Sequence, residues 1–190
     1  MAATPPDPDA SAREAGGPAP PTAPPAAPPA APGRGSVHDD VAALAALSGP
    51  LIGLDLGTKT IGIAVSDGLR LTATPLTTLR RRKFGEDAAA LERLFAERSI
   101  AGLVLGLPRN MDGSEGARCQ ATRAFARNMA GRGAPPVAFW DERLSTVAVE
   151  KALIAANSSR KRRAEVIDKL AAAFILQGAL DRLSVLAAQR

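Results

Sequence analysis

The sequence predicts an α/β fold, a mixed five-stranded sheet in which an antiparallel three-strand meander is followed by parallel strands, with helices flanking the sheet. Two observations predict it. Three runs rich in Leu, Ile, Val and Thr follow one another between residues 51 and 79 and are separated only by short polar turns. After them, helical and strand-like segments alternate, as they do where crossover helices connect parallel strands.

Each element follows from a local pattern. The meander strands are predicted at Leu51–Gly57, Ile61–Ser66 and Leu71–Leu79, and two buried parallel strands at 100–108 and 136–142. Apolar residues at helical spacing predict helices at about Glu86–Arg98, Ser114–Met129, Ser145–Ala155 and Ala164–Ala188. The stretch 37–50 either forms a short helix ending at Gly49-Pro50 or extends a linker.

Residues 1–36 form a Pro/Ala/Gly-rich segment that contains no Leu, Ile, Val or Phe. Such a segment cannot bury enough apolar surface to offset its ordering entropy, so we expect a disordered tail followed by one folded domain at 50–188. The segment lacks the pattern of a secretory signal or a transit peptide. No uninterrupted apolar run of about eighteen residues occurs, so we expect no membrane association.

The charge and the rare residues limit the chemistry. Removing the two arginines and three acids of residues 1–36 from the totals of 24 and 19 leaves a net charge of +6, which favours an anionic partner such as nucleic acid. The single Cys119 excludes an intramolecular disulfide and suits a cytoplasmic location. With His38 as the only histidine, a Ser-His-Asp triad is not expected, so catalysis must use carboxylates, Lys, Arg and hydroxyls.

Asp55 lies inside the first apolar strand, where an isolated charge would cost several kcal/mol. Alternation along the strand places it on the same face as Gly53 and Gly57, which leaves room for a ligand or a helix to approach. Asp55 must therefore be paired, protonated or bound to a metal. Asp67, by contrast, is followed by Gly68 and is better explained as a turn residue.

Two further acidic positions complete a candidate site. Asp141 and Glu142 end an apolar strand. Because neighbouring strand residues face opposite sides, only one of the two can face Asp55, and strand alternation leaves both open. A simpler explanation of the acidic pair is a polar strand end with a salt bridge to Arg143. Asp168 has Ala171, Ala172 and Ile175 at helical spacing, so it lies on an apolar, small-residue face, although an acid in the first turn would also stabilise the helix dipole.

Together these acids suggest a metal site. Oxygen ligands without His or Cys suit Mg²⁺ or Mn²⁺. Two such cations about 3.5–4 Å apart are the standard device for in-line phosphodiester cleavage. The chemistry therefore points to a nuclease.

Basic clusters support a phosphate-rich substrate. They lie at Arg80–Lys83 and at Arg160–Arg163, the second directly before the helix that carries Asp168, although solvated loop charge explains either alone. The segment 106–118 joins a strand to a helix start and is suited to phosphate binding, or Ser114 is simply its N-cap. With no Tyr, recognition of backbone and shape is favoured over base stacking.

Four segments resemble the bacterial YqgF/RuvX family, which is ribonuclease H-like and Holliday-junction-resolvase-like and whose members are described as pre-16S ribosomal RNA nucleases. They are GLDLGTKTIGIAVSD, GLPRNMDGSEG, DERLSTVAVEKAL and SRKRRAEVIDKLAAAFILQGALD, in this order, and the resemblance covers residues 50–182.

The resemblance implies a ribonuclease H-like fold and a cytoplasmic, metal-dependent endonuclease that matures the 5′ end of small-subunit ribosomal RNA in ribosome biogenesis. It implies Asp55, Glu142 and Asp168 as catalytic acids and ligands of Mg²⁺ or Mn²⁺, which selects Glu142 over Asp141. The candidate substrate-binding residues are Lys59, Arg109, Asn110, Arg143, Arg160, Lys161, Arg162 and Arg163.

Three other hypotheses stay open on the sequence. A junction resolvase acting on branched DNA would use the same acids and would need a symmetric dimer, whereas the RNA nuclease could be a monomer or a homodimer. The LDLGT stretch also resembles the phosphate loop of actin-like ATPases, but those need two such domains. A non-catalytic assembly factor would bind precursor ribosomal RNA or ribosomal particles through the basic clusters alone.

Overall fold

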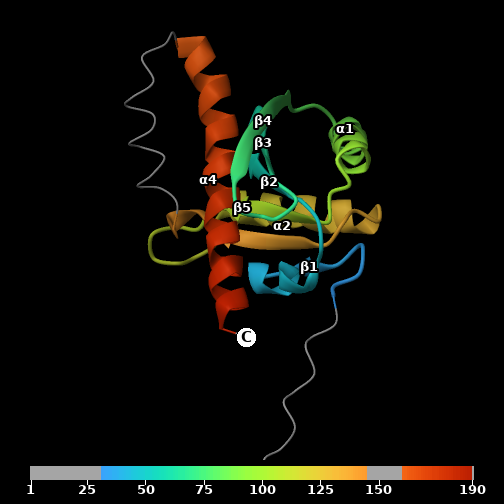
Figure 1. The fold of residues 1–190 in the computed structure, drawn as a ribbon. Coiled ribbons are helices and arrows are strands. Elements are labelled where there is room, and N and C mark those ends of the chain that lie inside the picture. Colours follow the sequence, from blue (N-terminus) through green and yellow to red (C-terminus); the bar gives the residue numbers. More distant parts are fainter. Residues whose placement is uncertain (1–30, 145–159, 190) are drawn as a thin grey trace, which may run out of the picture.

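The computed structural model describes residues 31–144 and 160–189, and of the side chains in this part it leaves out those of 144 and 160–169. Figure 1 shows one mixed sheet between two helical layers. The strands are β1 (Val37–His38), β2 (Leu51–Leu56), β3 (Thr60–Ser66), β4 (Ala73–Arg80), β5 (Gly102–Leu107) and β6 (Val137–Asp141). The helices are η1 (Val41–Ala46), α1 (Phe84–Glu97), α2 (Ala117–Gly131), η2 (Glu142–Leu144) and α4 (Arg160–Ala188).

The strand order is β1-β6-β5-β2-β3-β4. The strands β2, β3 and β4 form the expected antiparallel meander, and β5 and β6 add to β2 in parallel. The predicted α/β class, with an antiparallel meander followed by parallel strands and helices on both faces, is therefore confirmed. The count of five strands is one short, because Val37 and His38 pair in parallel with β6.

The N-terminal boundary lies earlier than the sequence indicates. The amide of Gly35 donates to Ala134 O (2.8 Å), and the amide of Val137 donates to Ser36 O (2.9 Å), which holds this segment against β6. The stretch after it forms β1 and the 3₁₀ helix η1, capped by Asp40, instead of one short helix. The expected disorder of the first thirty residues and the helix at Ser145–Ala155 lie outside the described residues.

The two faces of the sheet have separate cores, as strand alternation requires. One core, which includes Ile52, Leu54 and Leu105, packs against α1 and α2. The other, which includes Leu51 and Val104, packs against η1 and α4. Asp55 lies on the same face of β2 as Leu51 and Gly53, which are four and two residues before it, and so belongs to the α4 face.

Helix α4 approaches the sheet closely because glycines lie beneath it. A Cβ at Gly53 would lie 2.7 Å from Leu176 Cβ and 2.9 Å from Ala172 O. A Cβ at Gly178, on α4 itself, would lie 2.7 Å from the Trp140 ring. By length and composition Leu170–Ala188 would suffice to cross a membrane, but here it packs on the sheet as a core helix.

Candidate active site at the carboxyl ends of the strands

The parallel strands β2, β5 and β6 end at one edge of the sheet. Leu54 pairs with Leu105, and one residue further along each strand come Asp55 and Gly106. Gly106 in turn pairs with Trp140 of β6. Asp55 is thus next to Gly106 near the carboxyl ends of the strands, where ligands bind in sheets of this kind.

Gly106 provides the space in which the carboxylate of Glu142 lies. A Cβ at this position would lie 2.5 Å from Glu142 Oε1 and 2.5 Å from Ile175 Cδ1. The Glu142 side chain therefore covers the backbone of β5 on the face that α4 covers. This is also the face of Asp55, so the two carboxyl groups converge over the glycine.

The pKa of Glu142 records this convergence. Burial first, and then the negative charge of Asp55, raise the pKa of the Glu142 carboxyl to about 7. Two smaller effects act on the same pKa: the positive charge of Arg118 lowers it, and the negative charge of Asp141 raises it further. Two carboxyl groups that disfavour each other's ionisation form a pair that a cation would stabilise in its doubly ionised form.

Asp141, the alternative to Glu142, takes a different role. Its carboxylate accepts hydrogen bonds from Arg143 Nε (3.0 Å) and Arg143 Nη2 (2.7 Å). These bonds are the main reason that the pKa of Asp141 is lowered. The salt bridge that the sequence offered as the simpler explanation therefore applies to Asp141, while Glu142 faces Asp55.

Asp168, the third candidate acid, is on α4 as predicted, two helical turns before Ile175, whose side chain reaches Gly106. Its own side chain is among those left out. Among the described side chains no group of three or more possible metal ligands occurs. The converging pair of Asp55 and Glu142 nevertheless fits a divalent cation, because both are hard oxygen donors and burial, together with the charge of Asp55, keeps Glu142 partly protonated near pH 7.

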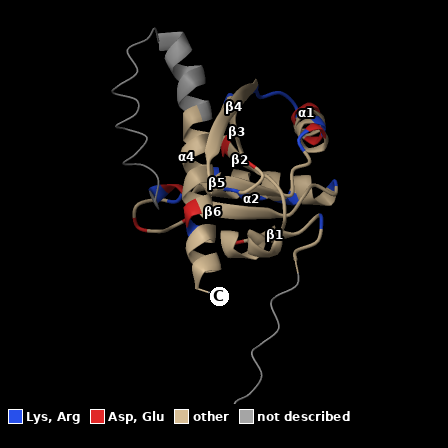
Figure 2. Cartoon of the chain, in the orientation of Figure 1, with Lys and Arg blue, Asp and Glu red and all other residues tan. Residues whose placement is uncertain are grey.

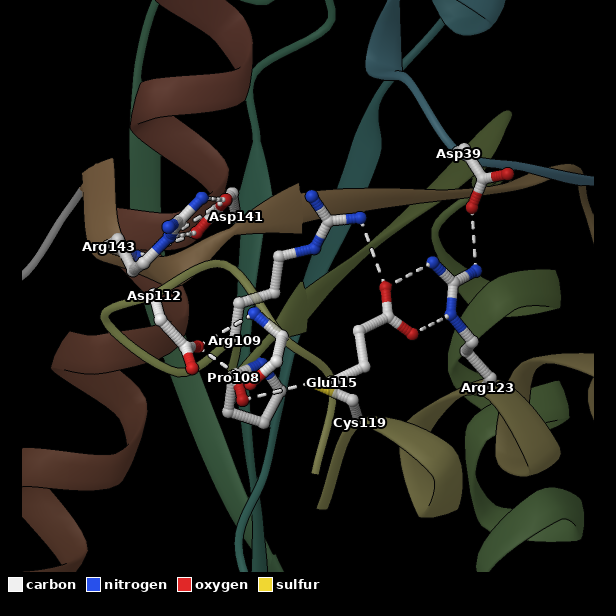
Figure 3. A network of polar contacts seen from close by, with 10 residues as sticks. Asp39, Pro108, Arg109, Asp112, Glu115, Cys119, Arg123, Asp141 and Arg143 are labelled. Carbon is white, nitrogen blue, oxygen red and sulfur yellow. Dashed lines mark hydrogen bonds and ion pairs between the residues drawn. The ribbon is translucent and has the colours of Figure 1, made fainter. Parts of the chain in front are cut away.

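The loop between β5 and α2 is held by a charged network, shown in Figure 3. Glu115 accepts from Arg123 Nε (2.7 Å) and Nη2 (2.7 Å) and from Arg109 Nη2 (3.0 Å), which lowers the pKa of Glu115 to about 2. Arg123 also pairs with Asp39 (2.6 Å), and its guanidinium lies 4.8 Å from the centre of the Phe139 ring. The network connects the loop to α2 and β6.

Ser114 is not the N-cap of α2, which the sequence offered as one explanation of this residue. The hydroxyl of Ser114 donates to Asp112 Oδ1 (2.6 Å), and the side-chain amide of Asn110 donates to Ser114 Oγ (2.8 Å). Ser114 is thereby part of the loop, and the helix begins at Ala117 with Gly116 as N-cap. Beside it, Cys119 is buried and donates from Sγ to the Pro108 carbonyl.

The other predicted substrate-binding residues differ in their surroundings. Lys59 is exposed in the turn between β2 and β3, whereas Arg109 and Arg143 are held by acids of the chain and Asn110 by Ser114. Residues 160–163 form the first turn of α4, and their side chains are not described.

The basic cluster Arg80–Lys83 lies at the edge of the candidate site. Strand β4 is antiparallel to β3, and β3 is antiparallel to β2, so β4 and β2 end at the same edge. Figure 2 shows this cluster in blue in the connection from β4 to α1. The sequence alone gave no reason to place it beside Asp55.

Sequence reasoning missed two residues of the site. Gly106 was noted only as part of a loop motif, although its lack of a side chain is what admits Glu142. Arg118 ends the same motif but is not among the predicted site residues, although its charge acts on the pKa of Glu142. Its place in the first turn of the helix that follows the motif was the available signal.

Asp67 is a turn residue and not part of the candidate site. Asp67 accepts hydrogen bonds from the amides of Leu69 (2.7 Å) and Thr72 (2.7 Å), so it closes the turn between β3 and β4. These bonds, that from Thr72 first, lower the pKa of Asp67. Its role is that of a turn residue, as the Asp67-Gly68 pair predicts.

Comparison with known proteins gives a consistent result. The protein-family model described as "RuvX: Holliday junction resolvase" matches residues 49–182 of the chain. A protein of Cereibacter sphaeroides named "Putative pre-16S rRNA nuclease" is 65% identical over 155 residues, which cover 82% of this chain and 96% of the relative. A protein of Ruegeria pomeroyi with the same name is 65% identical over 78% of this chain and 96% of its own length. Among solved structures, Thermus thermophilus RuvC in complex with a Holliday junction substrate matches with a TM-score of 0.49 and 15% identity, over 72% of this chain and 96% of that one.

Proposed function

Since the chain belongs to the RuvX family, we propose that it is a divalent-metal-dependent endonuclease that processes the 5′ end of precursor 16S ribosomal RNA in the cytoplasm. The observation that carries the proposal is the convergence of Asp55 and Glu142 over Gly106. It supports a nuclease because clustered carboxylates at the ends of parallel strands are suited to the metal chemistry of phosphodiester cleavage.

Asp55 and Glu142 would hold the cation, and Asp168 would complete its ligands from α4. A bound divalent cation, Mg²⁺ or Mn²⁺, would supply a nucleophilic water at neutral pH and stabilise charge on the leaving oxygen. The chain's own contribution is positioning. Gly106 lets the Glu142 carboxylate lie against β5, and Ile175 of α4 packs over the same glycine.

The charge of Arg118 favours ionised Glu142, which is the form that binds metal. Lys59 and Arg80–Lys83 lie at the same edge of the sheet and would attract a polyanionic strand towards the acids. The phosphate backbone, more than the bases, is the part of the substrate that these side chains can bind.

A Holliday junction resolvase is the second candidate, because the family model carries that description. It would use the same acids, so the substrate separates the two activities. A resolvase acts on two opposed strands and therefore needs two sites in a symmetric dimer.

The test is cleavage of a 5′-extended precursor 16S RNA and of a four-way DNA junction in parallel, each with Mg²⁺, Mn²⁺ or chelator. We expect metal-dependent cleavage of the RNA by the native protein and loss of about 10²-fold or more in Asp55→Asn, since a metal ligand is removed. Glu97→Gln is the matched control, because Glu97 is an exposed acid at the end of α1.

Cleavage of the junction alone would assign the resolvase activity. Cleavage that Asp55→Asn or chelator leaves unchanged would refute the metal mechanism. Binding of the RNA without cleavage of either substrate would identify a non-catalytic assembly factor.

A further inference from the structure

A small basic cavity lies beside the candidate site, on the opposite face of the sheet. It has a volume of about 80 Å³ and lies between the carboxyl end of β2 and the first two turns of α2. Its polar lining comes from Thr58, Arg81, Arg118 and Thr122, and Gly57 and Ala121 keep it open. We refer to it as the Arg81/Arg118 cavity.

The lining carries positive charge and no acidic side chain. Arg81 is fixed from both ends, because its amide donates to Lys59 O (2.9 Å) and its Nη1 donates to Gly57 O (2.9 Å). Its guanidinium is thus held at the mouth of the cavity with other N–H groups still able to donate. Arg118 comes from a different element and completes a two-sided cationic lining.

The cavity is adjacent to the catalytic candidates. Gly57 and Thr58 follow Asp55 by two and three residues, where β2 ends. Arg118 is near enough to Glu142 for its charge to act on that carboxyl group. A strand of nucleic acid that crosses this edge of the sheet would meet the acids on one face and the two arginines on the other.

We propose that the Arg81/Arg118 cavity binds one backbone phosphate of the nucleic-acid substrate, next to the phosphate that is cleaved; this rests on the proposed nuclease function. Guanidinium groups donate paired hydrogen bonds to phosphate oxygens, and threonine hydroxyls add single ones. A second phosphate held by fixed groups would position the reacting one, which is a major source of rate enhancement.

The size of the cavity selects a phosphate over larger ligands. Sites for cofactors and other small organic molecules usually enclose about 300–1,000 Å³. The cavity here is several times smaller and accommodates a tetrahedral anion, not a base or a nucleotide. A larger cavity of about 470 Å³ near Arg80 and Arg93 is less suited to phosphate, because Glu86 and Asp87 also line it.

The experiment measures binding of a single-stranded RNA that spans the cleavage site, in chelator, as a function of salt. We compare the native protein with Arg118→Gln, Arg118→Lys and the control Arg127→Gln, which removes an exposed arginine further along α2. Each phosphate contact with a single strand contributes about 0.7 to the slope of log K against log salt.

A second readout identifies the phosphate. Single phosphates near the cleavage site are replaced, one at a time, by neutral methylphosphonates. We expect one position at which the replacement weakens binding by the native protein about 10-fold, the scale of one charge-assisted hydrogen bond, and has no further effect in Arg118→Gln.

The proposal predicts that Arg118→Gln lowers the slope by about 0.7, that Arg118→Lys retains it, and that Arg127→Gln does not change it. An unchanged slope in Arg118→Gln, or equal methylphosphonate effects in both proteins, would overturn the phosphate site. If the native protein binds with the expected slopes but cleaves neither RNA nor junction, the proposed function fails while the phosphate contact stands.

Discussion

Replacement of Glu142 by Gln should stabilise the metal-free protein at alkaline pH. In the folded chain the pKa of Glu142 is raised from 4.5 to about 7, by burial and then by the charge of Asp55. In the unfolded chain the group ionises near its ordinary pKa. The folded state therefore binds more protons than the unfolded state between these two values, and the free energy of unfolding falls as pH rises through this window.

The magnitude follows from the shift. A difference of about 2.5 in pKa corresponds to a destabilisation of the folded state by at most about 3 kcal/mol. This destabilisation is complete above pH 7 and absent below pH 4.5. Gln has nearly the same shape and no charge, so Glu142→Gln should be more stable by up to this amount at pH 8. For a chain of this size that is a rise in Tm of about 6–12 °C.

Urea unfolding in chelator, at intervals from pH 4.5 to 8, measures the difference. We expect the native and Glu142→Gln curves to coincide at pH 4.5 and to separate as pH rises, while Glu97→Gln follows the native protein throughout. Added Mn²⁺ should stabilise the native protein and not Glu142→Gln, because only the former retains both acidic ligands. A difference that does not vary with pH, or a variant that is less stable at pH 8, would refute the convergence of Asp55 and Glu142.

Two further predictions concern the supports of the site. Gly106→Ala should cost about 1–3 kcal/mol of stability and abolish cleavage, because the new Cβ would lie 2.5 Å from both Glu142 Oε1 and Ile175 Cδ1. Thermal unfolding and the RNA cleavage assay test this prediction. Normal activity of the variant would contradict the placement of Glu142. Glu115→Gln should destabilise the chain at pH 7, because it removes the negative charge and one of the two oxygens that accept from Arg109 and Arg123. Urea unfolding tests this, and the difference should shrink as pH falls from 4.5 towards 2, because Glu115 itself becomes protonated there.

Local sequence patterns were sufficient to predict most helices and strands, and the faces of the strand and helix on which Asp55 and Asp168 lie. Alternation along β2 places Asp55 on the side of Gly53, and helical spacing places Asp168 in line with Ala172 and Ile175, whatever packs against them. The meander and the alternating half follow from runs and turns that lie within a few residues of one another. These features depend on backbone geometry alone, which is why the sequence carries them.

Long-range pairing decided the rest. Strand alternation could not choose between Asp141 and Glu142, and only the family resemblance favoured Glu142, because the choice depends on the register of β6 against β5 and on the free space over Gly106. The two-residue strand β1 is too short to show a period and exists only because it pairs with β6, a hundred residues away. The pairing of β4 and the packing of α2 at the end of β2 bring Arg81 and Arg118 to one cavity, a juxtaposition of three separate elements that no local pattern records.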